Sequence, residues 1–421
     1  MIKYRESVSV MAKKPEKNLI VALDIGTSKI AALVGEVGLD HTVEVIGFGA
    51  HPSRGLKRGV VVNIESTVQS IQRAIEEAEL MAGCEVHSAF TGIAGSHINS
   101  LNSHGIVAIR DREVNQADVD RVIDAAKAVA IPSDQRILHV LPQEFIIDQQ
   151  EGVREPIGMS GVRLEAKVHI VTGAVSAAQN ITKCVKRCGL QISDVILEQL
   201  ASSHAVLTED EKELGVCLVD IGGGTTDIAI FTEGAIRYTS VIPIAGDHVT
   251  NDVAVALRTP SQCAEEIKIR HGALCYDPAD SGQVIEVPSV AERPPRRIQK
   301  KALSQVVTAR YEELFALIAT ELRRSGFEDF VSAGIVLTGG GANIEGALEL
   351  SEAIFGMPVR LGLPQHVLGL VDVRQNPGYA TGVGLLLHGV QQQFEGLPRF
   401  DVDRGVMGVW SRMRSWFNGN F

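Results

Sequence analysis

The sequence lacks long hydrophobic runs, closely paired cysteines and an excess of positive charge. Its longest apolar stretches, near residues 331–338 and 380–390, are shorter than the roughly 18 residues that a membrane-spanning helix needs. No apolar core follows the basic residues near the N-terminus, so we expect no secretory signal. The chain has 40 Lys and Arg against 51 Asp and Glu, and the formal net charge of −11 argues against coating of nucleic acid by the whole surface.

The six cysteines contain no C-x-x-C motif. Cys184 and Cys188 are four residues apart in a predicted helix, so they could form half of a metal site. Small buried thiols in a reducing cytosol are the simpler interpretation, and we expect that one.

The composition is typical of folded proteins. Of the 421 residues, 45% are hydrophobic and 22% are charged, which excludes wholesale disorder. At roughly 150 residues per domain, this length predicts about two to four domains.

An internal repeat organises the chain. From Leu19 an apolar run, the turn D-I-G-T-S and a second apolar run predict two strands joined by a tight turn. The pattern returns near Leu214 as V-C-L-V-D-I-G-G-G-T-T-D-I-A-I-F, with Asp24 matching Asp220. The repeat indicates two related halves, each built on one such hairpin.

The remaining pattern predicts alternating helices and strands. Apolar residues at three- and four-residue spacing predict helices over residues 65–81 and 116–129. Further strands are predicted near 43–49, 140–147 and 166–171. We expect a surface loop at 280–301, a loose arm at 1–17 and a polar linker at 391–404.

The glycine turns are suited to binding phosphate, because a turn without Cβ atoms lets several backbone N–H groups converge on an anion. Two such turns that face each other could clamp the β- and γ-phosphates of a nucleotide. The predicted phosphate-binding residues are Asp24, Gly26, Thr27, Ser28, Gly222, Gly223, Gly224, Thr225 and Thr226. Asp24 and Asp220 would hold Mg²⁺ through its waters. A third cluster, with Gly339, Gly340, Gly341 and Asn343, suits the nucleoside end.

Other nucleotide motifs are excluded by their context. The sequence has no G-x-x-x-x-G-K-[ST] motif, so this is not a Walker-type site. The second turn is followed by an alternating strand, whereas a dinucleotide fingerprint needs a helix there. Each turn alone fits a plain hairpin, but the three together indicate a nucleotide site.

The last residues, 404–421, contain three arginines, both tryptophans of the chain and no acid. As a helix, this segment places its apolar side chains on one arc with arginines on both flanks, which predicts a helix lying in a lipid headgroup layer. The alternative is a helix docked on the protein body. The residues predicted to contact the membrane are Val406, Val409, Trp410, Arg412, Met413, Arg414, Trp416 and Phe417.

The three glycine segments resemble the actin/Hsp70/sugar-kinase superfamily. Four further stretches and the tail resemble the bacterial FtsA family: H-P-S-R-G at 51–55, S-G-V-R-L-E-A-K-V-H at 160–169, E-Q-L-A-S-S-H-A-V-L-T-E-D-E at 198–211 and V-P-S-V-A-E-R-P-P-R at 287–296. The resemblance runs from Leu19 to Phe421.

The resemblance implies an α/β, actin-like (duplicated ribonuclease-H-like) two-lobed fold with subdomains 1A, 1C, 2A and 2B and a C-terminal amphipathic helix. The implied boundaries are a flexible arm at 1–18, subdomain 1A at 19–93, 173–204 and 377–390, subdomain 1C at 94–172, subdomain 2A at 205–240 and 310–376, subdomain 2B at 241–309, a linker at 391–404 and the helix at 405–421.

The resemblance also implies a function. Such a protein binds ATP and Mg²⁺, self-associates, and tethers FtsZ filaments of the Z ring to the inner face of the bacterial cytoplasmic membrane at the septum, as a peripheral protein that helps to recruit later division proteins. We expect anionic lipids as a partner, no nucleic acid, and at most weak ATPase activity.

For each of three groups of residues, the sequence leaves two interpretations of their role open. Glu265 and Lys268 would contact the nucleoside or form an exposed ion pair. Glu198 could orient an attacking water, although a structural role at a helix terminus is the stronger interpretation. A basic segment is either solvated surface or an edge of the groove for the FtsZ C-terminal peptide, with Arg293, Arg296, Arg297 and Lys300 as candidates.

Rival functions fit less well. A small-molecule kinase of the same superfamily needs a general base beside a substrate pocket, has no distinct candidate here and has no use for the tail. A chaperone ATPase needs a further substrate-binding domain after the core. A pilus-assembly actin-like ATPase would lack the stretches at 160–169 and 287–296 together with the tail.

Overall fold

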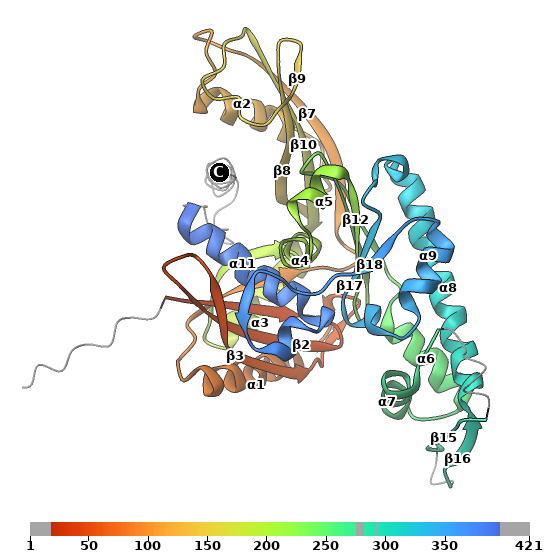
Figure 1. The fold of residues 1–421 in the computed structure, drawn as a ribbon. Helices are drawn as coiled ribbons and strands as arrows, with labels where there is room; N and C mark the ends of the chain where they lie inside the picture. Colours follow the sequence, from red (N-terminus) through yellow and green to blue (C-terminus); the bar gives the residue numbers. More distant parts are fainter. Residues whose placement is uncertain (1–17, 275–281, 291–293, 396–421) are drawn as a thin grey trace, which may run out of the picture.

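The computed structural model describes residues 18–274, 282–290 and 294–395. They form two lobes that meet side by side, and a smaller domain projects from the first lobe (Figure 1). No helix in these ranges is both long and apolar enough to cross a membrane.

A six-stranded sheet with the order β11-β6-β1-β2-β3-β19 forms the first lobe. Helices α1 and α3 cover one face of the sheet, while α4 and α11 cover the other. The elements are β1 (Leu19–Ile25), β2 (Lys29–Val37), β3 (Val43–Pro52), β6 (Ser88–Ile93), β11 (Gln191–Leu197), β19 (Val367–Gly369), α1 (Ile64–Ala82), α3 (Val175–Arg187), α4 (Glu198–Val206) and α11 (Ala380–Glu395), with the small pair β4 (Leu56–Lys57) and β5 (Val60–Val61) beside them.

A five-stranded sheet with the order β14-β13-β12-β17-β18 forms the second lobe. One face packs against α6, α7, α8 and α9, and the other joins the core that contains α4 and α11. The elements are β12 (Val216–Ile221), β13 (Thr226–Thr232), β14 (Ala235–Ile242), β17 (Ile335–Thr338), β18 (Val359–Leu361), α5 (Glu209–Leu214), α6 (Gly246–Leu257), α7 (Ser261–His271), α8 (Lys300–Ser325), α9 (Ala347–Phe355), α10 (Val371–Arg374) and the 3-10 turns η2 (Glu328–Phe330), η3 (Gly340–Asn343) and η4 (Pro377–Tyr379).

The predicted repeat is confirmed. In both lobes the hairpin strands pair antiparallel, β1 with β2 and β12 with β13, and the acidic residue stands one position before the end of its first strand. Asp24 and Asp220 therefore occupy equivalent places. Because both faces of each hairpin are covered, its strands read as nearly continuous apolar runs rather than alternating ones.

The projecting domain is a four-stranded sheet with one helix, inserted in the chain between β6 and α3. Its strands, in the order β7-β10-β8-β9, are β7 (Asn99–Ala108), β8 (Gln135–Ile147), β9 (Gln150–Val153) and β10 (Arg163–Ala174). Helix α2 (Gln116–Lys127) begins with a capping box between Asn115 and Asp118, and its apolar side buries Val119, Val122 and Ile123 against the sheet.

Two expectations were wrong. The segment 280–301 contains a hairpin, β15 (Val284–Val287) with β16 (Arg296–Gln299), because Ile285 and Val287 alternate inward and are buried. The linker does not begin at residue 391, since α11 continues to Glu395 and the Gln392 amide donates to Asp194 Oδ2 (2.6 Å). The arm at 1–17 and the amphipathic helix at 405–421 lie outside the described residues.

Candidate functional site

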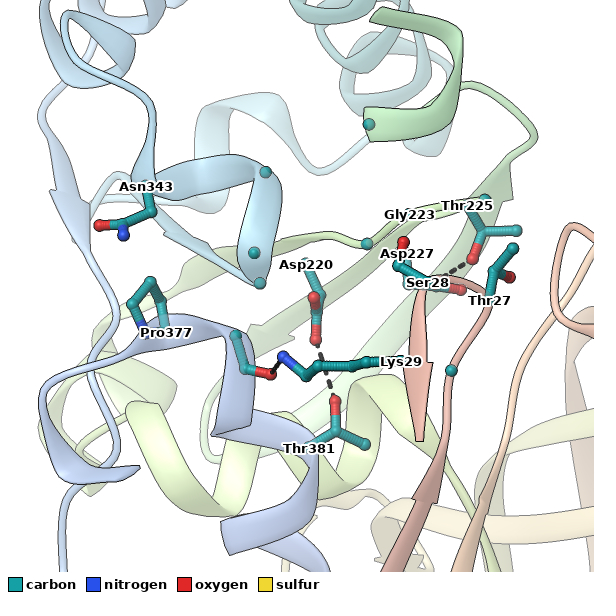
Figure 2. A pocket seen from close by; sticks show the side chains of 18 of the residues that line it. Thr27, Ser28, Lys29, Asp220, Gly223, Thr225, Asp227, Asn343, Pro377 and Thr381 are labelled. Atoms are coloured by element: carbon teal, nitrogen blue, oxygen red, sulfur yellow. Dashed lines mark hydrogen bonds between the residues drawn. The ribbon is translucent and has the colours of Figure 1, made fainter. Parts of the chain in front are cut away.

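A cavity of about 480 Å³ opens between the lobes, where the two hairpin turns meet (Figure 2). The turns are in such close contact that a Cβ on Gly223 would lie 1.7 Å from the Ser28 Oγ, so no other residue fits there. Eight of the nine predicted phosphate-binding residues line the cavity: Asp24, Gly26, Thr27, Ser28, Gly222, Gly223, Gly224 and Thr225.

Thr226 is the exception. It is the first residue of β13, its side chain is fully buried, and its hydroxyl donates to the carbonyl of Ile244 (2.8 Å). Successive side chains of a strand point to opposite sides, so Thr225 faces the cavity and Thr226 faces away from it.

The third glycine turn closes another side of the cavity. Gly339 has a positive φ of 84°, and a Cβ there would lie 2.3 Å from Asp220 Oδ1. The Tyr311 hydroxyl donates to the carbonyl of Gly341 (2.7 Å), which fixes the turn to α8. Gly340 and Asn343 also line the cavity, so all four residues predicted in this cluster are present.

Four carboxyl groups are gathered at the cavity: Asp24, Asp220, Asp227 and Glu198. Burial raises the pKa of Asp24 to about 6, against the opposing effect of Lys29, and raises the pKa of Asp220. Burial and the negative charge of Asp220 raise the pKa of Asp227 to about 8. Burial makes it unfavourable for these carboxyl groups to be ionised together, and a cation bound among them would favour their ionised forms.

Hydrogen bonds hold Asp220 in place. The Ser202 hydroxyl of α4 donates to Asp220 Oδ2 at 2.6 Å. The Thr381 hydroxyl of α11 donates to the same oxygen at 3.3 Å (Figure 2). On the opposite turn, the Lys29 ammonium donates to the carbonyl of Gly378 and lies 4.1 Å from the centroid of the Tyr379 ring. Residues of both lobes and of the start of α11 are thus held together by contacts of two charged groups, the Asp220 carboxylate and the Lys29 ammonium.

Glu198 is the first residue of α4 and also lines the cavity. Its position is therefore compatible with a role at the helix terminus and with a role in the candidate nucleotide site. Burial raises its pKa well above the ordinary value, and the neighbouring aspartates add to the effect.

The structure shows the ion pair between Glu265 and Lys268, whereas their contact with a nucleoside stays a prediction. The two residues line the cavity, and they form an ion pair with 2.7 Å between Nζ and Oε2. The Lys268 ammonium also donates to the Thr250 hydroxyl (2.9 Å) and the Gly246 carbonyl (3.2 Å), which ties α7 to α6. The pair is fixed at the cavity wall rather than free in solvent.

Among the described residues, no group of three or more His, Cys, Asp or Glu is arranged to hold a metal ion directly. Cys184 and Cys188 behave as structural thiols: the Cys188 thiol donates to the Cys184 carbonyl (3.3 Å), and burial raises the pKa of both. At the cavity, Asp24 and Asp220 fit a hard cation that keeps part of its water shell.

The basic residues predicted to border a peptide groove lie away from the cavity, on and next to the β15–β16 hairpin at the far end of the second lobe (Figure 1). Their role in a groove stays a prediction. Arg296 and Arg297 are exposed; the guanidinium of Arg296 donates to the Leu257 carbonyl, and Arg297 stands opposite Glu286. Lys300 begins α8. Arg293 and the residues of the predicted membrane helix lie outside the described residues.

Sequence reasoning missed Lys29, Asp227, Gly378 and Thr381. Lys29 and Asp227 directly flank the two predicted turns, so the turn positions could have pointed to them. Gly378 and Thr381 are more than a hundred residues from either turn, and nothing in their local pattern marks them. Only the packing of α11 brings them to the cavity.

The buried carboxyl of Asp227 predicts an unusual dependence of stability on pH. Its pKa is about 8 in the fold against 3.8 in an unfolded chain, so the fold must keep a proton that the unfolded chain releases. The contribution of this carboxyl to the free energy of unfolding is fully present below about pH 4. It is lost as the pH rises to about 8, by up to about 1.4 kcal/mol per pH unit. We expect Asp227→Asn to raise the Tm of the nucleotide-free, metal-free protein, and the gain to grow over this pH range.

Thermal unfolding in EDTA from pH 5 to pH 9 measures this effect. Asp111→Asn, in an exposed bend, is the matched control and should change Tm little at any pH. A gain for Asp227→Asn that does not vary with pH would contradict the prediction.

Comparisons with known proteins agree over the whole chain. A family model described as cell division protein FtsA matches residues 217–384, and a model of the SHS2 domain inserted in FtsA matches residues 95–172, the projecting domain. Cell division protein FtsA of Pseudomonas aeruginosa is 66% identical over 417 residues, which cover 98% of this chain and 100% of the relative. The FtsA of Escherichia coli K12 is 47% identical, with 98% and 100% covered.

Solved structures show the fold. A PilM–PilN type IV pilus biogenesis complex superimposes with a TM-score of 0.63 at 16% identity, covering 88% of this chain and 98% of that one. MreB 5 of Spiroplasma citri bound to AMPPNP gives 0.54 at 16% identity, covering 91% and 99%. At such identities the likeness concerns the actin-like fold, whereas the sequence relatives decide the family. The chain belongs to the FtsA family of actin-like cell division proteins.

Proposed function

We propose that this cell division protein binds ATP with Mg²⁺ between its lobes, self-associates, and tethers FtsZ filaments to the inner face of the cytoplasmic membrane at the division septum. In this role it helps to recruit later division proteins. The observation that carries the nucleotide part is the meeting of two glycine turns and a third one around a cavity that is lined by several carboxyl groups and by Lys29.

The residues present fit a nucleotide. Backbone N–H groups of the two turns and the Lys29 ammonium would hold the phosphates, and Asp24 and Asp220 would hold Mg²⁺ through its waters. The bound cation would neutralise charge on the β- and γ-phosphates. Glu265, Lys268 and the third turn would contact the nucleoside. MreB 5 of Spiroplasma citri, which shares the fold, has been solved bound to AMPPNP and to ADP.

We propose at most weak ATPase activity. Glu198 is the candidate closest to a general base, but it is the first residue of α4, where a structural role at the helix terminus is the stronger interpretation. Binding rather than turnover is the role for which this pocket is suited.

The tail supports membrane attachment, and the exposed arginines on β16 support binding of an acidic or carboxylate-ended peptide from FtsZ. A single short amphipathic helix binds lipid reversibly, comparable to one acyl chain. Several tails on one polymer bind far more firmly through effective concentration. Attachment is therefore expected to depend on self-association.

Asp220→Ala tests the nucleotide part. The variant loses one of the two carboxylates proposed to hold Mg²⁺ and leaves the Ser202 and Thr381 hydroxyls without their acceptor. We expect at least tenfold weaker binding of ATP in a calorimetric titration with Mg²⁺, and little difference between variant and wild type in EDTA. Wild-type affinity of a folded variant in Mg²⁺ would rule the site out.

A further inference from the structure

The inserted domain has an apolar root in the first lobe. Ile98, Leu138 and Val171 are buried in the core cluster that contains α1 and α3. The backbone N–H of Leu197 at the end of β11 donates to Nε2 of His139 on β8 (3.0 Å). Sequence order and packing thus both attach this domain to the first lobe.

Its other buried contacts reach the second lobe. Side chains of β7, β8 and β10 form hydrogen bonds with strand β14, an edge strand of the second-lobe sheet. We call this set of bonds the joint. They run from Ser100 Oγ to the Thr239 carbonyl (2.9 Å), from Asn102 Nδ2 to the Arg237 carbonyl (3.1 Å), from Gln143 Nε2 to the Ile236 carbonyl (2.9 Å), and between His169 Nε2 and the Thr239 hydroxyl (2.9 Å).

His169 lies at the centre of the joint and is 1% exposed. Its Nδ1 lies 2.7 Å from Asn102 Oδ1, an acceptor, so Nδ1 carries the proton and Nε2 accepts from the Thr239 hydroxyl. Burial lowers the pKa of His169 to about 4, which keeps the ring neutral, as this pattern requires. Separating the lobes here would leave several buried polar groups without partners, which is costly.

Strand β14 connects the joint to the cavity. It pairs with β13 from Thr226↔Ile242 to Thr232↔Ala235, and β13 begins where the second glycine turn ends. The Gln199 amide of α4 donates to Asp227 Oδ1 (3.1 Å) and reaches the Ser240 carbonyl of β14 (3.5 Å). A movement of the second lobe around the cavity therefore moves the part of β14 that contacts the inserted domain.

We propose that the inserted domain connects the two lobes as a brace: its root is fixed in the first lobe, and the joint restrains the second lobe from rotating away. Opening of the cavity then requires the joint to break, because its hydrogen bonds cannot stretch with the rotation. Release of the joint speeds exchange of whatever the cavity holds. The restraint itself is independent of the ligand, and only its effect on release rests on the proposed nucleotide site.

His169→Ala tests the brace in the full chain. We expect at least tenfold faster backbone hydrogen exchange in β14 and in the turn at 222–225, measured by mass spectrometry without nucleotide, and a several-fold faster release of a fluorescent ATP analogue in stopped flow. His169→Gln, whose amide can donate to Asn102 and accept from Thr239, should restore slow exchange. His104→Ala is the matched control, since His104 lies on β7 but pairs with Glu165 and not with β14.

Unchanged exchange in folded His169→Ala would overturn the proposal, as would an equal increase in His104→Ala. If His169→Ala does not fold, Ser100→Ala removes one bond at the edge of the joint and should give a smaller change in the same direction; no change there would also overturn it. Absence of ATP binding in the wild type would refute the proposed nucleotide site, while the exchange measurement would still decide on the brace.

Discussion

A chain that ends after Arg404 should no longer float with anionic liposomes and should no longer carry FtsZ to them. In the full chain, partial burial of six apolar side chains at about 1 kcal/mol each, and about 1 kcal/mol for each arginine near an anionic surface, gives a gross gain of about 9 kcal/mol. Ordering of the helix removes much of this gain. The net free energy is expected to give reversible membrane binding by one tail. Several tails on one polymer would strengthen this binding, and truncation would abolish it.

The position of the cut matters, because α11 ends at Glu395. The Phe394 ring stacks on His41 with 3.8 Å between ring centroids, and Gln392 is bonded to Asp194, so a cut after Gln393 would also disturb the first lobe. Ending the chain after Arg404 leaves these contacts intact. Liposomes of neutral, zwitterionic lipid are the control for the charge contribution.

Flotation over a range of protein concentrations should rise cooperatively for the full chain. If the shortened chain still recruits FtsZ to anionic liposomes, the tether is not in the tail. A simple one-site curve for the full chain would instead contradict the dependence on self-association.

Gly223→Val should abolish nucleotide binding, with affinity reduced at least a hundredfold. The new side chain would occupy the place of the Ser28 hydroxyl, because even its Cβ would lie 1.7 Å from that oxygen. The two turns would be forced apart, and their backbone N–H groups could no longer converge on one phosphate group. Binding of a fluorescent ATP analogue in Mg²⁺ measures the loss.

Gly340→Ala is a control for the stability effect only, since Gly340 lines the same cavity but a Cβ there meets no protein atom within 4 Å. Its Tm should equal that of the wild type, whereas Gly223→Val should lower Tm as well as affinity. Wild-type nucleotide affinity in Gly223→Val would mean that the turns do not form the phosphate site.

The sequence predicted those elements whose structure depends on residues close together in the chain, such as the two hairpins and their glycine turns. The paired apolar runs around Asp24 and Asp220 fix both hairpins, and the glycines between them fix the turns, so the phosphate-facing part of the cavity lining was predicted from the sequence. Thr226 could have been placed correctly by strand alternation alone. The short strands β15 and β16 were missed because only two inward residues on β15, Ile285 and Val287, distinguish that strand from a loop.

Contacts between distant segments were beyond the reach of sequence patterns. Thr381 contacts Asp220, and Lys29 contacts Gly378, only because α11 packs across the first-lobe sheet with its first turn at the cavity. The joint around His169 depends on side chains of three neighbouring strands of the inserted sheet that meet an edge strand of the second-lobe sheet. A single histidine on an apolar strand carries no signal of such a partner.

Helix α11 has a mechanical consequence. Gly382, Gly384 and Gly389 let it lie directly against Leu33, Ala201 and Phe90, so it has no room to shift sideways. Its sixteen residues form a rod about 24 Å long, with the Thr381–Asp220 contact near one end and the exit toward the tail at the other. A pull on the chain beyond residue 395 is therefore expected to act lengthwise along α11, toward its contact with the carboxylate proposed to hold the metal.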